Sequence, residues 1–155
     1  MASIRSLMTA QIVTAHPLET VADVVRRMSS RNIGSVLILD DGRLTGIFSE
    51  RDLLMRVVGW GRDPERTRIG DVATPSPVAV EVNAPLRDVL QLFRSKKFRH
   101  LPVLDDGRPI GVVSTRDLLD ALVDGFERFV DEMRFKREMA EGADPYDHLG
   151  GSYGL

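Results

Sequence analysis

Two short segments of the chain place a serine, an arginine and an aspartate at the same spacing. They read Ser49-Glu-Arg-Asp52 and Ser114-Thr-Arg-Asp117, and each follows a run of apolar residues. If a helix begins at each serine, its unpaired N–H groups and the serine hydroxyl can donate hydrogen bonds to a phosphate. A carboxylate three residues later can accept hydrogen bonds from both hydroxyls of a ribose. This chemistry suits a nucleotide monophosphate or a larger nucleotide.

The same spacing also has a purely structural interpretation. Ser-x-x-Asp is close to a capping box, in which the serine oxygen accepts a hydrogen bond from a free backbone N–H. The acid is also favourable near the positive end of a helix. Taken alone, either segment is better explained as a helix cap than as a ligand site.

A duplication of the whole chain gives the ligand interpretation more weight. Gly46-Ile-Phe-Ser-Glu-Arg-Asp-Leu-Leu54 returns as Gly111-Val-Val-Ser-Thr-Arg-Asp-Leu-Leu119, and 111 − 46 gives an offset of 65 residues. Asp40-Asp-Gly-Arg43 returns at the same offset as Asp105-Asp-Gly-Arg108. Two copies without gaps predict a pseudo-twofold body with a cleft between the halves, where ligands usually bind. Gly46 and Gly111 are expected to let a ligand approach the backbone closely.

One basic pair breaks the symmetry of the two copies. Arg99-His100 precedes a predicted strand in the second copy, where the first copy has Gly34-Ser35. Arginine offers a fixed charged fork to phosphate, and histidine adds a donor whose charge varies near neutral pH. A solvated pair at a strand edge explains these residues equally well. If the pair binds phosphate, we expect the site with Asp117 to prefer more phosphate groups than the site with Asp52.

Apolar periodicity predicts the same order of elements in both copies. Val21, Val24 and Met28 follow helical spacing, with Thr20 as N-cap, and Asp41-Gly42 is typical of a type I′ hairpin turn. The first copy has strands at 13–15, 35–39 and 44–48 and helices at 21–31 and 49–58. A polar linker at 59–68 leads to strands at 78–82, 101–104 and 110–113 and helices at 86–97 and from 115. The fold class is therefore α/β (α+β), built from two β-α-β-β-α units.

The last predicted helix extends well beyond its counterpart in the first copy. It runs from Thr115 to about Glu141, roughly 40 Å at 1.5 Å per residue. It carries an apolar stripe of Leu119, Leu122, Phe126, Phe129, Val130 and Met133. We expect this stripe to contact a second subunit rather than only its own domain. The tail from Gly142 is expected to be flexible.

Bulk composition excludes several functional classes. The net charge of −2, from 21 basic and 23 acidic residues, argues against a nucleic-acid binder. The absence of cysteine excludes disulfides and thiol catalysis. The three histidines lack zinc-ligand spacing, and no nucleophile elbow or phosphate loop is present. A cytoplasmic protein without membrane spans or a catalytic metal is expected.

Taken together, these motifs resemble the cystathionine-β-synthase (CBS) domain family. The marks are Gly-h-h-Ser-x-x-Asp twice, Asp-Asp-Gly-Arg twice, Asn32-Ile-Gly34 and Arg99-His-Leu-Pro-Val103. The chain looks like a stand-alone bacterial or archaeal CBS pair, also called a Bateman module. The resemblance covers about Ile4 to Leu122 and implies CBS repeats at 4–58 and 69–122, with a linker at 59–68. The expected C-terminal helix extension at 123–141 and the tail at 142–155 lie beyond it. The resemblance also implies a homodimer, up to two clefts for adenosyl ligands, and no catalytic activity.

Site residues follow from this resemblance position by position. Asp52 and Asp117 would hold ribose, and Ser49 and Ser114 would contact phosphate or ribose. Arg51 and Arg116 would lie beside the phosphate. Arg99 and His100 align with a pair that binds phosphate in the γ subunit of AMP-activated kinase. Weaker candidates for adenine contacts are Ala15, Ile38, Val80 and Val103.

The function expected from the sequence is therefore a regulatory sensor. AMP, ADP, ATP or S-adenosylmethionine would bind in the cleft as a regulatory ligand, and an unidentified protein target would respond. One alternative is a dimeric interaction module with empty clefts. A nucleic-acid module using Arg26, Arg27, Arg94, Lys96, Lys97 and Arg99 is opposed by the overall acidity. An enzyme acting on nucleotides lacks a general-base constellation.

Overall fold

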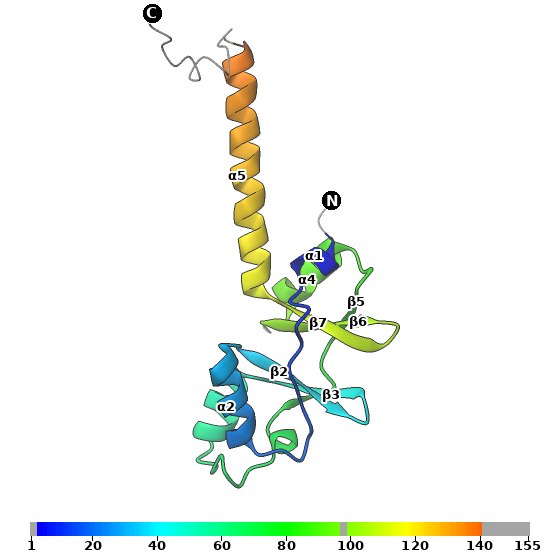
Figure 1. Ribbon diagram of the computed structural model, residues 1–155, viewed down its shortest axis with the longest axis vertical. Helices are drawn as coiled ribbons and strands as arrows, with labels where there is room; N and C mark the ends of the chain where they lie inside the picture. Colours follow the sequence, from blue (N-terminus) through cyan, green and yellow to red (C-terminus); the bar gives the residue numbers. More distant parts are fainter. Residues whose placement is uncertain (1–2, 97–98, 141–155) are drawn as a thin grey trace, which may run out of the picture. The chain divides into compact units, whose positions relative to one another are not determined.

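The computed structural model describes residues 3–96 and 99–140 of the 155-residue chain. The expected tail at 142–155 lies outside these residues, as do residue 141 and Lys97. The chain divides into two units, Met1–Asp117 and Leu118–Leu155. Both CBS-like copies, apart from the last helix, lie in the first unit, whose elements are labelled in Figure 1.

The first copy follows the predicted order of elements. Strand β1 (Thr14–Ala15) pairs in parallel with β2 (Ser35–Asp40), which pairs antiparallel with β3 (Arg43–Ser49). Helix α2 (Val21–Arg31) has Thr20 as its N-cap, whose hydroxyl oxygen accepts a hydrogen bond from the Asp23 N–H at 3.2 Å. Its buried face packs into a core with apolar residues of β2 and β3, as its helical spacing predicts.

The second copy repeats this arrangement in detail. It contains β5 (Val80–Glu81), α4 (Leu86–Ser95), β6 (His100–Asp105) and β7 (Arg108–Ser114), in a sheet ordered β5-β6-β7. Both hairpins turn through Asp-Gly pairs with positive φ, 47° and 76° at Asp41-Gly42 and 48° and 75° at Asp106-Gly107. The predicted type I′ turns are confirmed. Each hairpin also carries a register shift at the same place, after Ile38 and after Val103.

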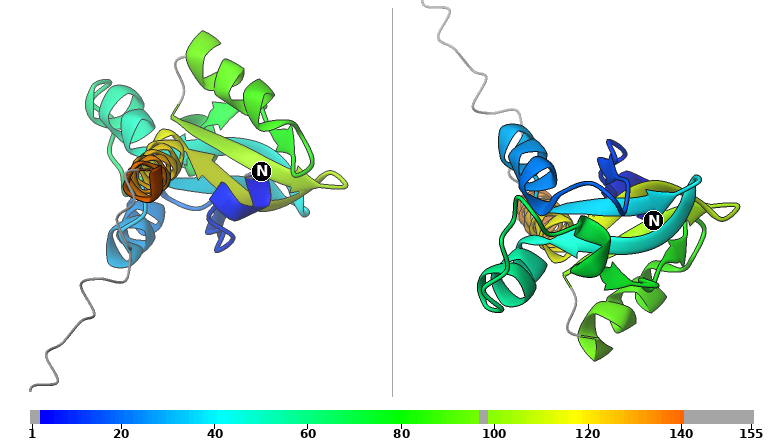
Figure 2. Two further views of the ribbon diagram at one scale, coloured as in Figure 1. Left: turned by 90° about the horizontal axis from the view of Figure 1, so that it is seen from above. Right: turned by 90° about the horizontal axis from the view of Figure 1, so that it is seen from below.

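The segments that lead into the two copies are exchanged. Strand β4 (Thr74–Pro75) begins the second copy but pairs with β3 of the first, completing a sheet ordered β1-β2-β3-β4. Reciprocally, Thr9 of the first copy pairs with Val112 on β7. Two short helices precede these contacts, α1 (Ile4–Leu7) and the 3₁₀-helix η2 (Ile69–Asp71). The exchange ties the copies together, and β3 also contacts β7 where the hairpins stack in Figure 2.

Gly46 and Gly111 serve this exchange rather than a ligand. A Cβ at Gly46 would lie 3.1 Å from the carbonyl oxygen of Thr74, and one at Gly111 would lie 3.0 Å from that of Thr9. The expectation that these glycines admit a ligand is wrong, because the exchanged segment occupies the space beside each one.

The helix expected at 49–58 differs from a regular α-helix. Only a short α-helical turn, α3 (Glu50–Asp52), follows Ser49, and a π-helix, η1 (Leu53–Val58), continues it. π-Helical turns are rare and are frequent at functional sites. The equivalent segment of the second copy runs without interruption as α5 (Thr115–Ala140).

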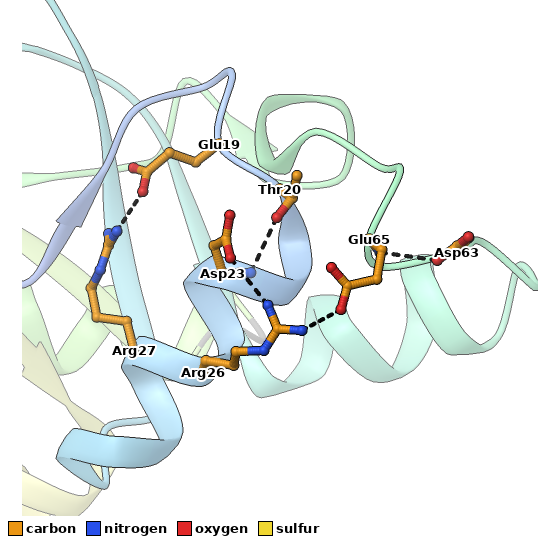
Figure 3. A network of polar contacts seen from close by, with 7 residues as sticks. All are labelled: Glu19, Thr20, Asp23, Arg26, Arg27, Asp63 and Glu65. Atoms are coloured by element: carbon orange, nitrogen blue, oxygen red, sulfur yellow. Dashed lines mark hydrogen bonds and ion pairs between the residues drawn. The ribbon is translucent and has the colours of Figure 1, made fainter.

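The polar linker is bound to the start of α2 by backbone and side-chain contacts. Residues Val21 and Ala22 donate backbone hydrogen bonds to the carbonyls of Thr67 and Pro64, at 2.9 and 3.0 Å. Figure 3 shows the accompanying ion pairs, in which Arg26 contacts Asp23 within α2 and Glu65 of the linker. Figure 3 also shows an ion pair that joins Arg27 to Glu19. These contacts occupy two arginines that a nucleic-acid surface would require.

The second unit consists, in its described part, of the remainder of α5. Its apolar side chains are largely exposed, with Phe126 at 68% and Leu122 at 62% of full exposure. Among the helices in the described residues, none is both long enough and apolar enough to span a bilayer.

Candidate functional site

A cavity of about 420 Å³ lies between the two copies within the first unit. It brings Ser49, Arg51 and Asp52 from the end of β3 and the following turn together with Arg99 and His100 at the start of β6. The remaining lining residues are Ile47, Glu50, Met55, Arg56, Thr74, Pro77 and Val78. Five of the eight main site residues predicted from the sequence therefore share one cavity.

Asp52 is the buried charge of this cavity, at 8% of full exposure. Its Oδ2 accepts hydrogen bonds from the backbone N–H and the hydroxyl of Ser49, at 2.9 and 3.1 Å. Its Oδ1 accepts one from the hydroxyl of Thr74 at 3.2 Å and lies 3.6 Å from the Arg56 guanidinium. The capping interpretation of Ser49 and Asp52 is confirmed, and these contacts also fix the direction of the carboxylate.

Asp117 makes the equivalent cap with fewer partners. Its Oδ2 accepts hydrogen bonds from the backbone N–H and the hydroxyl of Ser114, at 2.6 and 2.7 Å, and its own N–H donates to the Ser114 hydroxyl oxygen. Asp117 is half-buried, and no hydrogen bond from Thr9, the counterpart of Thr74, reaches it within the described ranges. Ser114, Arg116 and Asp117 do not line the cavity.

The basic pair lies on a different side of the fold from the one expected. We expected Arg99 and His100 to serve the site with Asp117, but they line the cavity of Asp52. The cause is the packing of the two copies, which brings His100 over Gly34 of the first copy. A Cβ at Gly34 would lie 3.6 Å from His100 Nε2 and would clash with the Glu50 carboxylate.

The surroundings of the two equivalent positions also differ. Glu50 donates a backbone hydrogen bond to the Gly34 carbonyl at 3.1 Å, and Thr115 donates the equivalent bond to Arg99 at 3.0 Å. The Glu50 carboxylate lies over Gly34 and would have to move to admit a side chain there. Threonine at position 115 is shorter than glutamate, and its partner position carries arginine.

His100 has a perturbed titration. Burial lowers the pKa of His100 from its ordinary value of 6.5, because the interior disfavours the charged imidazolium. The carboxylates of Glu50, Asp117 and Asp52 act in the opposite direction, and Arg99 reinforces the lowering. His100 therefore lies among charges of both signs, where the arrival of an anion would change its proton affinity.

The apolar wall of the cavity differs from the one expected. The weaker adenine candidates, Ala15, Ile38, Val80 and Val103, are buried at 8% exposure or less, and Ala15 and Ile38 pair within the first sheet. None of the four lines the cavity. Ile47, Met55, Pro77 and Val78 provide its apolar surface instead. Sequence reasoning missed them because Pro77 and Val78 belong to the exchanged segment and Met55 to the π-helix.

Metal binding has no support in the described part of the chain. No group of three or more histidine, aspartate or glutamate side chains there is placed to hold an ion. The cavity carries three arginines against two carboxylates. Its charge and shape therefore fit an organic anion with an apolar part better than they fit a cation.

Comparison with known proteins identifies the repeats. The chain matches the family model of the CBS domain twice, over residues 4–59 and 69–124. A CBS domain-containing protein of Bacillus subtilis, YhcV, is 30% identical over 118 residues, which cover 76% of this chain and 84% of that protein. An uncharacterised protein of Methanopyrus kandleri is 31% identical over 76% of this chain and 61% of its own length.

Solved structures agree with this assignment. A crystal structure of a CBS domain superposes with a TM-score of 0.74 at 29% identity, covering 79% of this chain and 99% of the other. The family match, its two residue ranges and the duplicated hairpins all define the same pair of repeats.

Proposed function

Because the chain belongs to the CBS-domain family as a tandem pair, we propose that it is a non-catalytic sensor of adenosyl ligands. CBS pairs are generally regulatory modules. The ligand would be AMP, ADP, ATP or S-adenosylmethionine. The single observation that carries the proposal is the cavity in which the Ser49–Asp52 turn of one repeat meets Arg99 and His100 of the other.

Each part of such a ligand has a suitable neighbour in this cavity. Arg51 and Arg99 offer charged donors to phosphate, and Arg56 lies 3.6 Å from Asp52, where it holds the carboxylate. Asp52 would accept hydrogen bonds from the ribose hydroxyls in exchange for one or more of its present contacts. Ile47, Met55, Pro77 and Val78 would enclose the adenine.

The two repeats are not equivalent in this proposal. The Asp52 cavity combines carboxylate, arginines and apolar wall, so we assign it as the principal site. The Ser114, Arg116 and Asp117 group would form a second, weaker site, since the positions equivalent to Arg99 and His100 carry Gly34 and Ser35. A ligand in the cavity would change how the two repeats contact each other only if it binds one arrangement of the repeats more tightly than another.

We also infer that the sensor acts as a cytoplasmic homodimer with a protein target. The exposed apolar stripe of α5 supports a protein contact, because contiguous exposed apolar surface marks interaction sites. The competing interpretation, an interaction module with empty clefts, is favoured by one observation: both oxygens of Asp52 already have hydrogen-bond partners.

Calorimetric titration with AMP, ADP, ATP, S-adenosylmethionine and GMP distinguishes the two interpretations. We expect adenosyl ligands to bind and GMP to bind more weakly. Arg99→Ala should weaken the binding of phosphate-containing ligands by about tenfold to a hundredfold, as loss of a charged hydrogen bond predicts. Asp52→Asn should weaken all adenosyl ligands, including S-adenosylmethionine.

The matched controls come from the other repeat. Arg116→Ala and Asp117→Asn change the equivalent charges outside the cavity and should leave the principal affinity within about twofold. Absence of binding by every ligand, in protein shown to carry no co-purified nucleotide, would overturn the sensor and leave the interaction module. Loss of affinity in the Arg116 and Asp117 variants alone would move the principal site to the second repeat.

A further inference from the structure

The exposed face of α5 has the spacing of a coiled-coil seam. Leu119, Leu122, Phe126, Phe129 and Met133 alternate by three and four residues, which is the 3.5-residue period of two wound helices. Val123, Val130 and Met139 flank this seam on the same face. All eight side chains lie between 45% and 68% of full exposure.

The charges along the same helix are separated by sign. From Asp120 to Glu132 there are five acidic residues (Asp120, Asp124, Glu127, Asp131 and Glu132) and one basic residue, Arg128. From Met133 to Ala140 there are three basic residues (Arg134, Lys136 and Arg137) and one acidic residue, Glu138. A second copy that runs in the opposite direction therefore brings the basic end of one helix near Asp120 of the other.

The seam itself distinguishes the two possible directions of pairing. Continuing the alternation from Met133 places Lys136 on the seam. In a parallel pair, Lys136 of one copy would face Lys136 of the other. This arrangement places two like charges together and is costly. In an antiparallel pair centred on the phenylalanines, Lys136 faces Leu119 of the other copy, beside Asp120.

We propose that α5 pairs with α5 of a second copy as an antiparallel two-stranded coiled coil. Phe126 of one copy packs against Phe129 of the other, Leu122 against Met133 and Leu119 against Lys136. Arg134 and Arg137 then lie at the level of residues 121 and 118 of the other copy, on either side of its Asp120. The opposed helix dipoles favour the same direction.

The size of the seam suits a stable dimer rather than a transient contact. Standard interfaces bury about 800 Å² on each partner, and eight large, half-exposed side chains present an apolar area of that order. At each end of the seam, a second copy also places Asp120 near the basic residues Arg134 and Arg137. The proposal specifies the geometry of the homodimer proposed above and is independent of nucleotide binding.

Single cysteines test the direction directly, because the native chain contains none. We would prepare Leu119→Cys and Lys136→Cys proteins and oxidise each alone and in an equimolar mixture that has been allowed to exchange subunits. Antiparallel pairing predicts a disulfide-linked dimer in the mixture and little in either protein alone, since positions 119 and 136 are about 25 Å apart along one helix. Parallel pairing predicts efficient crosslinking in each protein alone.

The controls separate the direction of pairing from the existence of the dimer. Asp131→Cys lies on the opposite face of α5 and should not crosslink in any combination. Sedimentation of the uncrosslinked full-length chain should give a dimer, and Phe126→Ser with Phe129→Ser should give a monomer. A dimer that crosslinks only in the single-variant samples would overturn the antiparallel arrangement and keep the homodimer. A monomeric wild-type chain would overturn both the homodimer and its antiparallel arrangement. Nucleotide binding is tested separately by calorimetry.

Discussion

Asp52 and Asp117 occupy equivalent positions in the two repeats but have different surroundings. Asp52 is buried and bonded to Ser49 and Thr74, whereas Asp117 is half-buried and bonded to Ser114. His100 lies among the charges of both. At this scale the Asp52 carboxylate already has polar partners, so a ribose that enters the cavity would have to replace some of them.

The titration of His100 gives a pH dependence with a definite sign. Burial lowers the pKa of His100 in the folded chain, so the unfolded chain takes up the proton at higher pH than the folded one. The stability due to neutral His100 is full above about pH 6.5, the unfolded value, and is lost as the pH falls towards the folded pKa. We expect the free energy of unfolding to fall more between pH 7.5 and 5.5 in the wild type than in His100→Gln.

The measurement is urea denaturation at each pH, with His16→Gln as the control. His16 is exposed and lies 3.6 Å from Asp40, away from the cavity. Equal pH slopes in the wild type and the His100 variant would contradict the assignment. A bound phosphate should raise the pKa of His100, which the imidazole signals in NMR spectra would report.

At the scale of elements, sequence pattern predicted most of the framework. Helix α2, both hairpins and the start of α5 lie within a residue or two of the expected bounds, because local periodicity and Asp-Gly turns specify them. Strand β4 could not be predicted, since two residues carry no periodicity and their partner β3 lies about 27 residues earlier in the chain. Non-local packing also determines that Arg99 lines the cavity of Asp52, so this placement could not be predicted either.

The exchanged segments supply a matched pair of threonines. Thr74 donates a hydrogen bond to buried Asp52, whereas Thr9 occupies the equivalent place on β7. We expect Thr74→Val to lower the free energy of unfolding by about 1.5 kcal/mol, because a hydrogen bond to a charged group is lost. Thr9→Val should change it by less than about 0.5 kcal/mol.

Urea denaturation of the two variants and the wild type provides the comparison. Backbone pairing is retained in both substitutions, so a larger loss in Thr74→Val reports the bond to Asp52 together with the partial burial of Thr74. Equal losses would mean that the Thr74 hydroxyl does not support Asp52. Thr74→Val should also weaken adenosyl ligands if the orientation of Asp52 matters to the site.

At the scale of the whole molecule, the chain combines a duplicated body with one long helix whose apolar face continues beyond its counterpart in the first repeat. The duplication in the sequence predicts the two repeats and also the residue from which the last helix extends beyond its counterpart in the first repeat. The apolar stripe was also evident in the sequence. To infer the direction of the partner helix, the distribution of charge along α5 was needed in addition to the apolar stripe.

Dimerisation through α5 predicts a stability that depends on protein concentration. A hundredfold rise in concentration should add about 2.7 kcal/mol per dimer, which raises the midpoint of the helical circular-dichroism transition by several degrees. The midpoint of the Phe126→Ser, Phe129→Ser double variant should not change. Asp131→Asn, on the opposite face, should behave as the wild type. A wild-type midpoint that is independent of concentration would contradict the prediction.

The exchange of lead-in segments determines how this architecture can be divided into fragments. A cut in the 59–68 linker would leave each fragment without the segment that borders its own hairpin, since Thr74 pairs with β3 and Thr9 pairs with β7. Neither half is then a complete folding unit, but the two fragments together hold every contact of the intact body. Two separate single-repeat chains that swapped their first residues would make the same contacts. The tandem chain thus has the contacts of a domain-swapped dimer of single repeats, joined in one chain by the linker.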